Sequence, residues 1–235
     1  MSSPELIVAL DFPSEKEAMS MARTLAGHVR WLKVGLELFC RTGPTWVQRL
    51  KDMGFHIFLD LKFMDIPHTV QGAVASACAA GADMLTIHLL GGQAAAKAAC
   101  QSVREAEHPP VLLGVTVLTS MCPADLALLS PAQQHPDLTQ TVLTLAVKAQ
   151  TWGLDGIVCS GQEVADIRQH CRTPFTLVTP GIRLGDPQKN DDQQRVTTPQ
   201  AAVSAGSDYL VVGRPITRSS NPLQSAHSFL NAIKE

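Results

Sequence analysis

Short apolar segments alternate with helix-like segments eight times along the chain. The apolar segments are rich in Val, Ile and Leu, which is typical of parallel strands buried on both faces. We expect strands at residues 6–12, 31–39, 84–90, 111–118, 156–160, 175–179 and 209–214, and one that starts at residue 58. We expect helices at residues 14–26, 44–53, 68–80, 138–152, 163–170 and 222–234, with an Ala-rich helix after residue 92. Ser14 with Glu17 resembles a helix N-terminus, and Gly81 a helix end.

Repeated strand–helix units of this kind predict a (β/α)8 TIM barrel, formed by residues 1–235 as a single domain. A doubly wound open sheet holds the same elements, but it calls for a glycine-rich loop such as G-x-G-x-x-G, and none follows the first strand. The length of 235 residues fits one barrel, and 45% hydrophobic residues suffice for its core.

The composition of the chain limits the classes of binding partner that we expect. The formal net charge is −2, which gives no reason to expect nucleic acid or an anionic membrane as partner. No apolar run approaches the roughly 18 residues of a membrane span, and the first residues lack the basic region of a signal peptide. The six cysteines are dispersed without a C-x-x-C pair, so they are expected to be reduced. We expect a soluble cytoplasmic protein.

Three charged residues interrupt the third strand and its end. Asp60 and Lys62 are two residues apart, so an extended strand directs both side chains to one face, while Asp65 lies beyond the strand. Charges in a buried strand are unfavourable unless they are paired or functional. The segment therefore indicates an active site, and the alternative is an ion-pair network that only fixes the local fold.

Other polar residues stand at the carboxyl ends of the expected strands, where barrels of this type gather their functional groups. They are Asp11, Lys33, His88, Thr119, Ser120, Arg183 and Arg214. Each has a local alternative, such as a helix cap for Asp11 or a turn for Thr119 and Ser120. His88 is open between a structural histidine and a neighbour of the site. Together the residues favour a ligand at one mouth of the barrel.

Two segments indicate that this ligand carries phosphate. Pro180-Gly181-Ile182-Arg183 follows the seventh strand, and Gly213-Arg214 ends the eighth, the place where many barrels bind phosphate. Glycine lets the backbone approach an anion, and arginine adds bidentate contacts. The polar loop at about 184–194 is expected to be a mobile lid on the phosphate side, with Gln193 as a candidate contact; the alternative is a solvated loop.

The chain resembles the orotidine 5′-monophosphate decarboxylase family, and is closest to its compact bacterial type. The resemblance begins with Asp60-x-Lys62-x-x-Asp65-Ile66-Pro67-x-Thr69 and continues over the whole chain. The other matching motifs, in order, are Ala9-Leu10-Asp11, Lys33-Val34-Gly35, Leu118-Thr119-Ser120, Thr179-Pro180-Gly181-Ile182-Arg183, Asp192-Gln193, Thr198-Pro199 and Val212-Gly213-Arg214-Pro215.

This resemblance implies decarboxylation of orotidine 5′-monophosphate to UMP and CO2, the last step of de novo UMP synthesis, with neither a metal nor an organic cofactor. It implies a homodimer in which Asp65 and Thr69 serve the neighbouring subunit's site. Lys33, Asp60, Lys62 and Asp65 match a catalytic charged array. The residues matching substrate contacts are Asp11 and Lys33 at the ribose, Thr119 and Ser120 at the pyrimidine, Arg183, Gln193, Gly213 and Arg214 around the phosphate, and Ile66 and Pro180 within the same motifs.

The chemistry of that reaction explains the residue types. Loss of CO2 leaves an electron pair at C6 that the pyrimidine π-system cannot accept, so the site must stabilise a localised carbanion electrostatically. Lys62 can do so and then protonate C6. Asp60 either repels the substrate carboxylate or orients Lys62 and keeps it charged; we favour carbanion stabilisation, with repulsion secondary.

Two other functional classes remain as alternatives. A related metal-dependent phosphosugar decarboxylase or lyase uses the same barrel but requires carboxylate ligands, and Phe58 and Leu59 precede Asp60 where a further acid is expected. A non-catalytic protein that binds a phosphorylated ligand is the second alternative.

Overall fold

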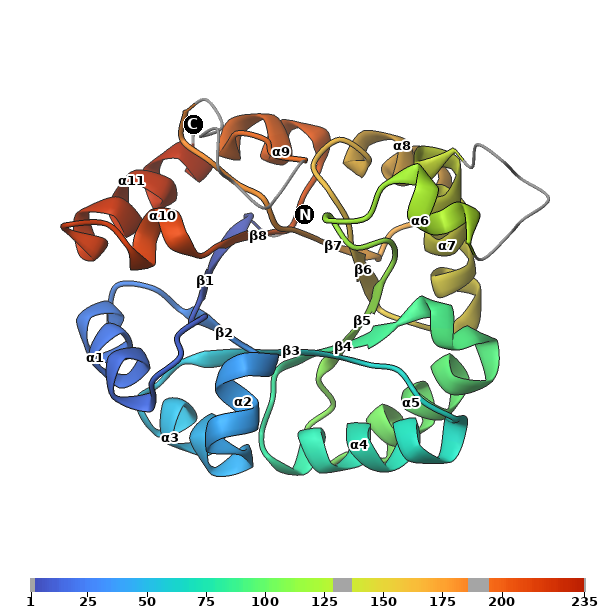
Figure 1. Cartoon of the computed structure of the whole chain (residues 1–235), viewed down its shortest axis with the longest axis horizontal. Coiled ribbons are helices and arrows are strands. Elements are labelled where there is room, and N and C mark those ends of the chain that lie inside the picture. Colours follow the sequence, from blue (N-terminus) through green and yellow to red (C-terminus); the bar gives the residue numbers. More distant parts are fainter. Residues whose placement is uncertain (1–2, 129–136, 186–194, 235) are drawn as a thin grey trace.

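The computed structural model describes residues 3–128, 137–185 and 195–234, and it contains a closed barrel of eight strands in chain order. All neighbouring strands are parallel. Figure 1 looks into the ring of strands, which the helices surround. The strands are β1 (Glu5–Ala9), β2 (Trp31–Gly35), β3 (His56–Phe63), β4 (Met84–His88), β5 (Val111–Val115), β6 (Gly156–Val158), β7 (Thr176–Thr179) and β8 (Tyr209–Val212). The expected (β/α)8 TIM barrel is confirmed.

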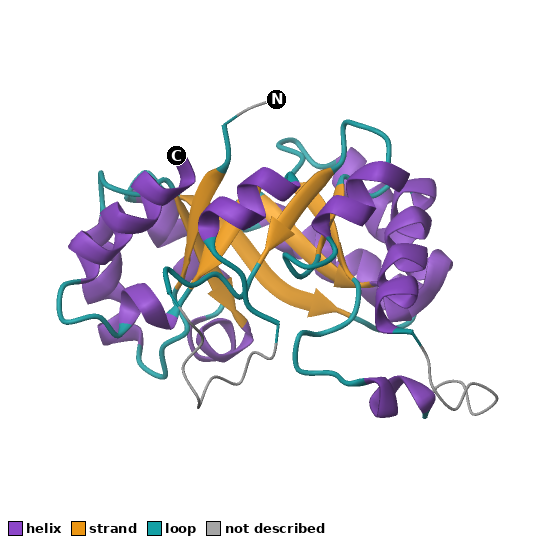
Figure 2. Cartoon of the chain, turned by 90° about the horizontal axis from the view of Figure 1, so that it is seen from above, coloured by secondary structure: helices purple, strands orange, loops and turns teal. Residues whose placement is uncertain are grey.

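Helices follow the strands and cover the outside of the barrel (Figure 2). They are α1 (Glu15–Leu25), α2 (Leu36–Thr42), α3 (Pro44–Asp52), α4 (Pro67–Ala79), α5 (Gly92–Glu105), α6 (Pro123–Ala127), α7 (Leu138–Trp152), α8 (Val164–His170), α9 (Pro199–Ala205), α10 (Arg214–Thr217) and α11 (Pro222–Lys234), with a 3-10 turn η1 (Leu89–Gly91). No helix in the described ranges is long and apolar enough to cross a bilayer.

The second strand is shorter than the sequence predicts. The strand expected at residues 31–39 ends at Gly35, and residues 36–39 belong to α2. Leu36 is exposed whereas Leu38 is fully buried, so these two leucines occupy different sides of a helix. The alternation of Leu and Glu resembles a strand because a segment this short fits both periods. The strands expected at 6–12, 84–90 and 111–118 also end earlier, at Ala9, His88 and Val115.

Inside the barrel, the inward-facing positions change character along each strand. Near the amino ends of β2, β3 and β4, Trp31, Phe58 and Met84 form part of a buried apolar cluster. The next inward positions, two residues later, are Lys33, Asp60 and Thr86. The apolar cluster fills the barrel toward the amino ends of the strands. Its remaining members are Ile7, Ala9, Leu113, Val178 and Val211. The polar groups are thereby left at the carboxyl end.

The opposite end of the barrel carries a Gly-x-Asp motif before three of the four even-numbered strands. Gly81-Ala82-Asp83, Gly153-Leu154-Asp155 and Gly206-Ser207-Asp208 precede β4, β6 and β8, and each glycine has a positive φ (85°, 95° and 108°). Each carboxylate accepts a hydrogen bond from a backbone N–H of the preceding strand. The donors are Ile57 in β3 (2.7 Å), Leu112 in β5 (2.8 Å) and Leu177 in β7 (2.7 Å). Each carboxylate thus joins an even strand to the odd strand before it. The backbone carbonyl of the same aspartate accepts an N–H of the next odd strand, from Val111 in β5, Thr176 in β7 and Glu5 in β1.

Candidate active site

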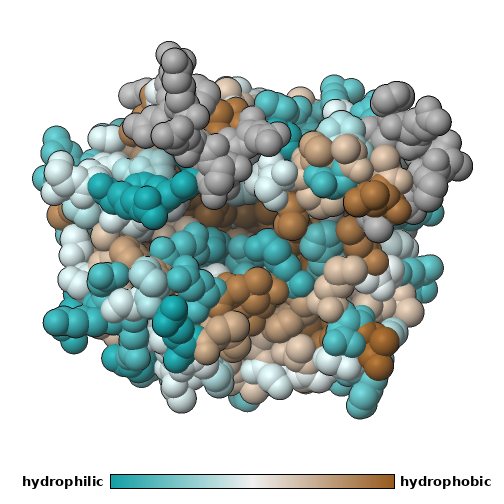
Figure 3. Space-filling view, viewed as in Figure 1, coloured by the Kyte–Doolittle hydropathy of each residue, from teal (hydrophilic) through white to brown (hydrophobic). Residues whose placement is uncertain are grey.

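A cavity of about 440 Å³ lies at the carboxyl ends of the strands. Figure 3 shows it as a central hollow with hydrophilic side chains along it. The residues expected from the sequence that line it are Asp11, Lys33, Asp60, Lys62, Thr119, Pro180, Arg183, Gly213 and Arg214. Its volume lies in the range of small-molecule sites. Most of the expected strand-end positions therefore surround one space, as the barrel rule predicts.

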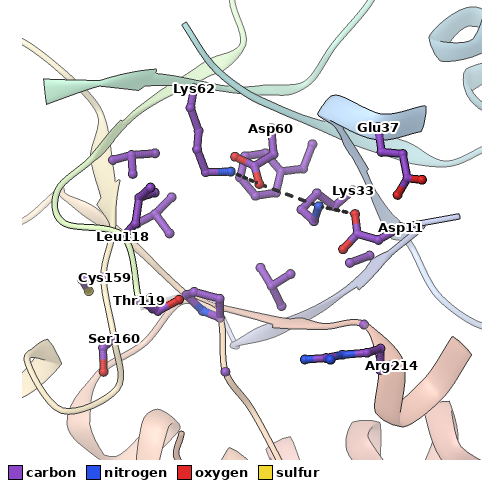
Figure 4. Close-up of a pocket in the computed structure, with 18 of the residues that line it drawn as sticks. Asp11, Lys33, Glu37, Asp60, Lys62, Leu118, Thr119, Cys159, Ser160 and Arg214 are labelled. Atoms are coloured by element: carbon purple, nitrogen blue, oxygen red, sulfur yellow. Dashed lines mark hydrogen bonds and ion pairs between the residues drawn. The ribbon is translucent and has the colours of Figure 1, made fainter. Parts of the chain in front are cut away.

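Four charged side chains form a row along one side of this cavity (Figure 4). The Lys33 ammonium lies between two carboxylates, 2.8 Å from Asp11 Oδ1 and 3.7 Å from Asp60 Oδ2. The Lys62 ammonium lies 2.8 Å from the same Oδ2 of Asp60. Acid and base thus alternate as Asp11, Lys33, Asp60 and Lys62. The side chains of Lys33 and Asp60 are almost fully buried, whereas that of Lys62 is 31% exposed.

The ion pairs keep the central members of the row charged. Burial is the largest influence on Asp60 and favours the neutral acid, but Lys33 and Lys62 together with hydrogen bonds outweigh it and lower its pKa. Burial likewise opposes the charge on Lys33, and the carboxylates of Asp60 and Asp11 reverse this and raise its pKa. Both side chains are therefore ionised near neutral pH, and each depends on the other.

An irregularity in β3 directs Lys62. The pairing with β4 passes from Leu59↔Leu85 to Phe63↔Ile87, four residues along β3 against two along β4. Lys62 lies within this bulge and is the only non-glycine residue with positive φ (51°) in the described ranges. Such a conformation costs about 1–3 kcal/mol and is typical of functional positions. The strained backbone is thus that of Lys62, whose ammonium forms the ion pair with Asp60.

Thr86 stabilises the bulge from β4 and was missed by the sequence reasoning. Its hydroxyl accepts the backbone N–H of Lys62 (2.9 Å) and donates to Asp60 Oδ1 (3.0 Å), and the residue is fully buried. The hydroxyl replaces the strand partner that the bulge removes. The sequence does contain a signal for Thr86. It precedes His88 by two residues, so the two side chains lie on the same face of β4.

The side of the cavity opposite the charged row carries the glycine–arginine segments. Figure 4 shows Arg214 across the cavity from Asp60 and Lys62. Gly181 follows β7 with a φ of 80°, and Gly213 lies between β8 and Arg214. Arg183 also lines the cavity. The geometry thus separates a cationic side, suited to an anion, from the alternating acid–base row.

Some expected site residues lie elsewhere. Asp65, Ile66 and Thr69 are exposed and do not line the cavity of their own chain, and the Asp65 carboxylate accepts the N–H of Ile66 (2.6 Å). Ser120 also lies outside the cavity lining. Gln193 and most of the loop expected as a lid fall outside the described residues, so these expectations remain predictions.

His88 has a structural contact. Its Nδ1 accepts the N–H of Leu90 at 3.3 Å and caps η1. Burial, and to a lesser degree the Lys62 ammonium, lowers the pKa of the imidazole. His88 does not line the cavity, so the cap accounts for its position without a ligand.

Further lining residues were not singled out from the sequence. Glu37, Ser160 and Arg218 are polar, and Leu118, Val158 and Val211 are apolar. Ser160 ends the sixth expected strand, so the strand-end rule would have found it. Glu37 was assigned to the second strand, and its actual place in α2 determines its approach to the cavity.

Comparison with known proteins identifies the family of this chain. Residues 4–229 match the family model described as orotidine 5′-phosphate decarboxylase / HUMPS. A relative named orotidine 5′-phosphate decarboxylase in Nitratidesulfovibrio vulgaris (strain DP4) is 50% identical over 230 residues, covering 96% of each chain. One in Lawsonia intracellularis is 48% identical over 233 residues, covering 97% of this chain and 99% of the relative. The crystal structure of orotidine 5′-phosphate decarboxylase from Lactobacillus acidophilus aligns over 100% of both chains with a TM-score of 0.86 and 34% identity. The chain belongs to the orotidine 5′-phosphate decarboxylase / HUMPS family.

Proposed function

We propose that this protein decarboxylates orotidine 5′-monophosphate to UMP and CO2 without a cofactor. The observation that carries the proposal is the pair of Lys62 and Asp60, 2.8 Å apart, facing a cavity whose opposite side carries Arg183 and Arg214. The full-length similarity to proteins named orotidine 5′-phosphate decarboxylase supports the same substrate.

The cavity can orient the nucleotide in one direction. Arg183 and Arg214, with Gly181 and Gly213 allowing close backbone approach, suit the phosphate. Asp11 and Lys33 then face the ribose, and Thr119 faces the pyrimidine. This orientation brings C6 and its carboxylate to Asp60 and Lys62. Binding energy from the distant phosphate thereby holds the reacting carbon beside the lysine.

Lys62 carries the chemical step in this scheme. When the C6–CO2 bond breaks, both bonding electrons stay on C6 in an sp² orbital, and the nearby ammonium stabilises this negative charge. Lys62 then transfers a proton to C6, which yields UMP and leaves a neutral amine that regains its proton from solvent. The strained backbone of Lys62 favours one fixed direction for its side chain, which suits electrostatic stabilisation of a localised charge.

Asp60 acts first by holding the Lys62 ammonium in place through the 2.8 Å ion pair. Its second effect is repulsion of the substrate carboxylate, since two like charges about 4 Å apart interact by roughly 4 kcal/mol at an effective dielectric of 20. The two neighbouring ammonium groups offset much of this repulsion, because Asp60 lies 3.7 Å from Lys33 and 2.8 Å from Lys62. Orientation of Lys62 is therefore the main role, and repulsion is secondary.

The metal-dependent alternative requires a cluster of side chains that can hold a metal ion. In the part of the chain that the structure describes, no group of three or more His, Cys, Asp and Glu side chains is arranged to hold a metal ion. The carboxylates of Asp11 and Asp60 are both engaged by lysines. An assay in the presence of a chelator separates the two classes directly.

The test follows the loss of orotidine monophosphate absorbance after treatment with EDTA. Wild-type turnover should survive the chelator, and Lys62→Ala should abolish it while retaining UMP binding. Lys51→Ala is the matched control, because Lys51 also pairs with an aspartate, Asp83 at 2.6 Å, but is absent from the cavity lining. Loss of activity with EDTA that metal restores would favour the metal-dependent class. Undiminished turnover by Lys62→Ala would refute the assigned role.

We also propose a homodimer with shared active sites. Residues 64–69 are all exposed, although Met64 (56%) and Ile66 (67%) are large and apolar. Leu36 and Leu90 are likewise exposed, and Figure 3 shows hydrophobic surface beside the hollow. A two-fold contact through this surface would cover the apolar side chains and bring Asp65 and Thr69 toward the neighbour's cavity.

Mixing two inactive variants tests the shared site. In a hybrid of Lys62→Ala and Asp65→Ala subunits, one site has both defects and the other has none. Equal mixing with full exchange should therefore restore about a quarter of wild-type activity. Subunit exchange is followed by a mass tag on one variant. Proven exchange without recovered activity would place Asp65 in its own subunit's site.

A further inference from the structure

A buried ion pair beside the cavity has no part in the chemistry described so far. It joins Arg195 Nη1 to Glu163 Oε1, with side-chain exposures of 13% and 6%. Burial raises the pKa of Glu163, although the Arg195 charge and the N–H of Ser160 oppose the rise. Buried ion pairs contribute little net stability compared with apolar side chains of similar size. The location of this pair therefore calls for an explanation other than stability.

Arg195 reaches the segment that follows β5. Its Nη2 donates to the carbonyl oxygens of Val117 and Leu118, both at 3.3 Å. Thr119 comes next in the chain, and Leu118 and Thr119 both line the cavity (Figure 4). A single guanidinium thus holds the backbone immediately before the residue that faces the pyrimidine in the proposed binding mode.

Glu163 extends the same contact to the end of β6. Its Oε2 accepts the backbone N–H of Ser160 at 2.8 Å, and Ser160 lines the cavity. We call Leu118, Thr119 and Ser160 the base-side wall. Arg195 contacts this wall directly through Leu118 and indirectly through Glu163.

The segment that carries Arg195 is joined to the phosphate side. Thr197 forms two backbone hydrogen bonds with the loop after β7: its N–H donates to the Gly181 carbonyl (3.1 Å), and its carbonyl accepts the Arg183 N–H (3.0 Å). Thr197 also packs closely on the β6 turn, since a Cβ placed on Gly161 would lie 2.3 Å from Thr197 Cγ2. Arg195 is two residues away from this junction.

We propose that Arg195 is a positioning residue that fixes the base-side wall relative to the phosphate-side loop at Gly181 and Arg183. Glu163 orients its guanidinium. The contacts of Arg195 and Glu163 set the distance between the groups that contact the base and those that contact the phosphate. A ligand that has both parts can then contact both sets of groups at once. This role rests on the proposed function only for the identity of the ligand.

Binding of two ligands to variants tests the proposal. UMP contains base and phosphate, whereas ribose 5-phosphate lacks the base. Arg195→Met should weaken UMP binding by about tenfold and change ribose 5-phosphate binding by less than about twofold, the first being roughly 1.4 kcal/mol. Arg195→Lys should recover part of the UMP affinity, because an ammonium pairs with Glu163 but lacks the planar fork that contacts the carboxylate through one nitrogen and the two carbonyls through another.

Arg168→Met is the matched control. Arg168 also pairs with a carboxylate, Asp208 at 2.5 Å, and donates to two backbone carbonyls, but it is absent from the cavity lining. This variant should lower the melting temperature without changing the ratio of the two affinities. Equal weakening of both ligands by Arg195→Met, or no weakening of either, would overturn the proposal.

Hydrogen–deuterium exchange tests the same proposal without any ligand. Amides of residues 116–122 should exchange faster in Arg195→Met than in wild type, and at the wild-type rate in Arg168→Met. Unchanged exchange in Arg195→Met would refute the positioning role even if the protein decarboxylates orotidine monophosphate. A wild-type protein that binds no UMP would instead refute the proposed function and leave the exchange result to decide this inference.

Discussion

Replacing Thr86 by valine should remove the support of the β3 bulge with little change of shape. The hydroxyl accepts the Lys62 N–H (2.9 Å) and donates to the Asp60 carboxylate (3.0 Å). Valine has a methyl group in place of the hydroxyl and can do neither. Because Thr86 is fully buried, water cannot readily replace the lost contacts.

The expected loss of stability follows from these two hydrogen bonds. A hydrogen bond to an ionised group contributes about 1.5–3 kcal/mol, and an unsatisfied buried N–H costs about 1–3 kcal/mol. Burial of the new methyl group offsets about 0.8 kcal/mol. We therefore expect the free energy of unfolding to fall by about 2–5 kcal/mol. For a chain of this length, the melting temperature should fall by roughly 4–20 °C.

The catalytic effect should be larger than the effect on substrate binding. The strained backbone of Lys62 would lose its fixed direction, and a displacement of about 1 Å from productive geometry costs on the order of 100-fold in rate. We expect kcat to fall by about 100-fold, while KM changes by less than about threefold because the phosphate contacts remain.

The assays are thermal unfolding followed by circular dichroism and steady-state decay of orotidine monophosphate absorbance. Thr86→Ser is the control, since it keeps the hydroxyl and should restore most of kcat. The reasoning would be refuted if Thr86→Val kept wild-type kcat and melting temperature. A variant that lost stability but kept kcat would show that Thr86 supports the fold without positioning Lys62.

Stability should also depend on pH through the charged row. The lowered pKa of Asp60 stabilises the fold above its ordinary value of 3.8, and this contribution is lost as pH falls through the folded-state pKa. The raised pKa of Lys33 stabilises the fold below 10.5, and this contribution is lost as pH rises through the folded-state pKa. Urea unfolding across pH should show a smaller acid-side loss in Asp60→Asn, and identical acid profiles would contradict the pairing. In a separate test, Gly156→Ala should destabilise by about 3 kcal/mol or more, because its Cβ would lie 2.1 Å from the Thr176 carbonyl oxygen. Gly72→Ala, in open space within α4, should be neutral or stabilising by about 0.5–1 kcal/mol in the same urea titration.

Much of the fold and of the cavity could be predicted because their signals are local. Each buried strand is a short apolar run, and the barrel then brings the residues at the strand ends together. The two-residue period of a strand was enough to predict that Asp60 and Lys62 lie on one face. The same period placed Lys33 on β2, where it meets both aspartates.

The remaining features depend on neighbouring strands. The positive φ of Lys62 follows from a register shift against β4, and nothing in residues 58–63 alone specifies it. Thr86 acquires its role only when β3 and β4 are paired. Arg195 is far in sequence from Leu118, so their contact depends on closure of the barrel. Such residues were missed because their roles are created by tertiary contacts.

The three Gly-x-Asp motifs give the barrel a modular construction. Each aspartate pins the start of an even strand to the odd strand before it, so β3–β4, β5–β6 and β7–β8 are each joined within one continuous stretch of chain. Over β3–β8 these side-chain contacts therefore favour a quarter-barrel of two strands, rather than a single strand and helix, as the unit for recombination or circular permutation. A cut between Glu107 and Pro110 would fall between two such quarters, after the pair pinned by Asp83 and before the pair pinned by Asp155.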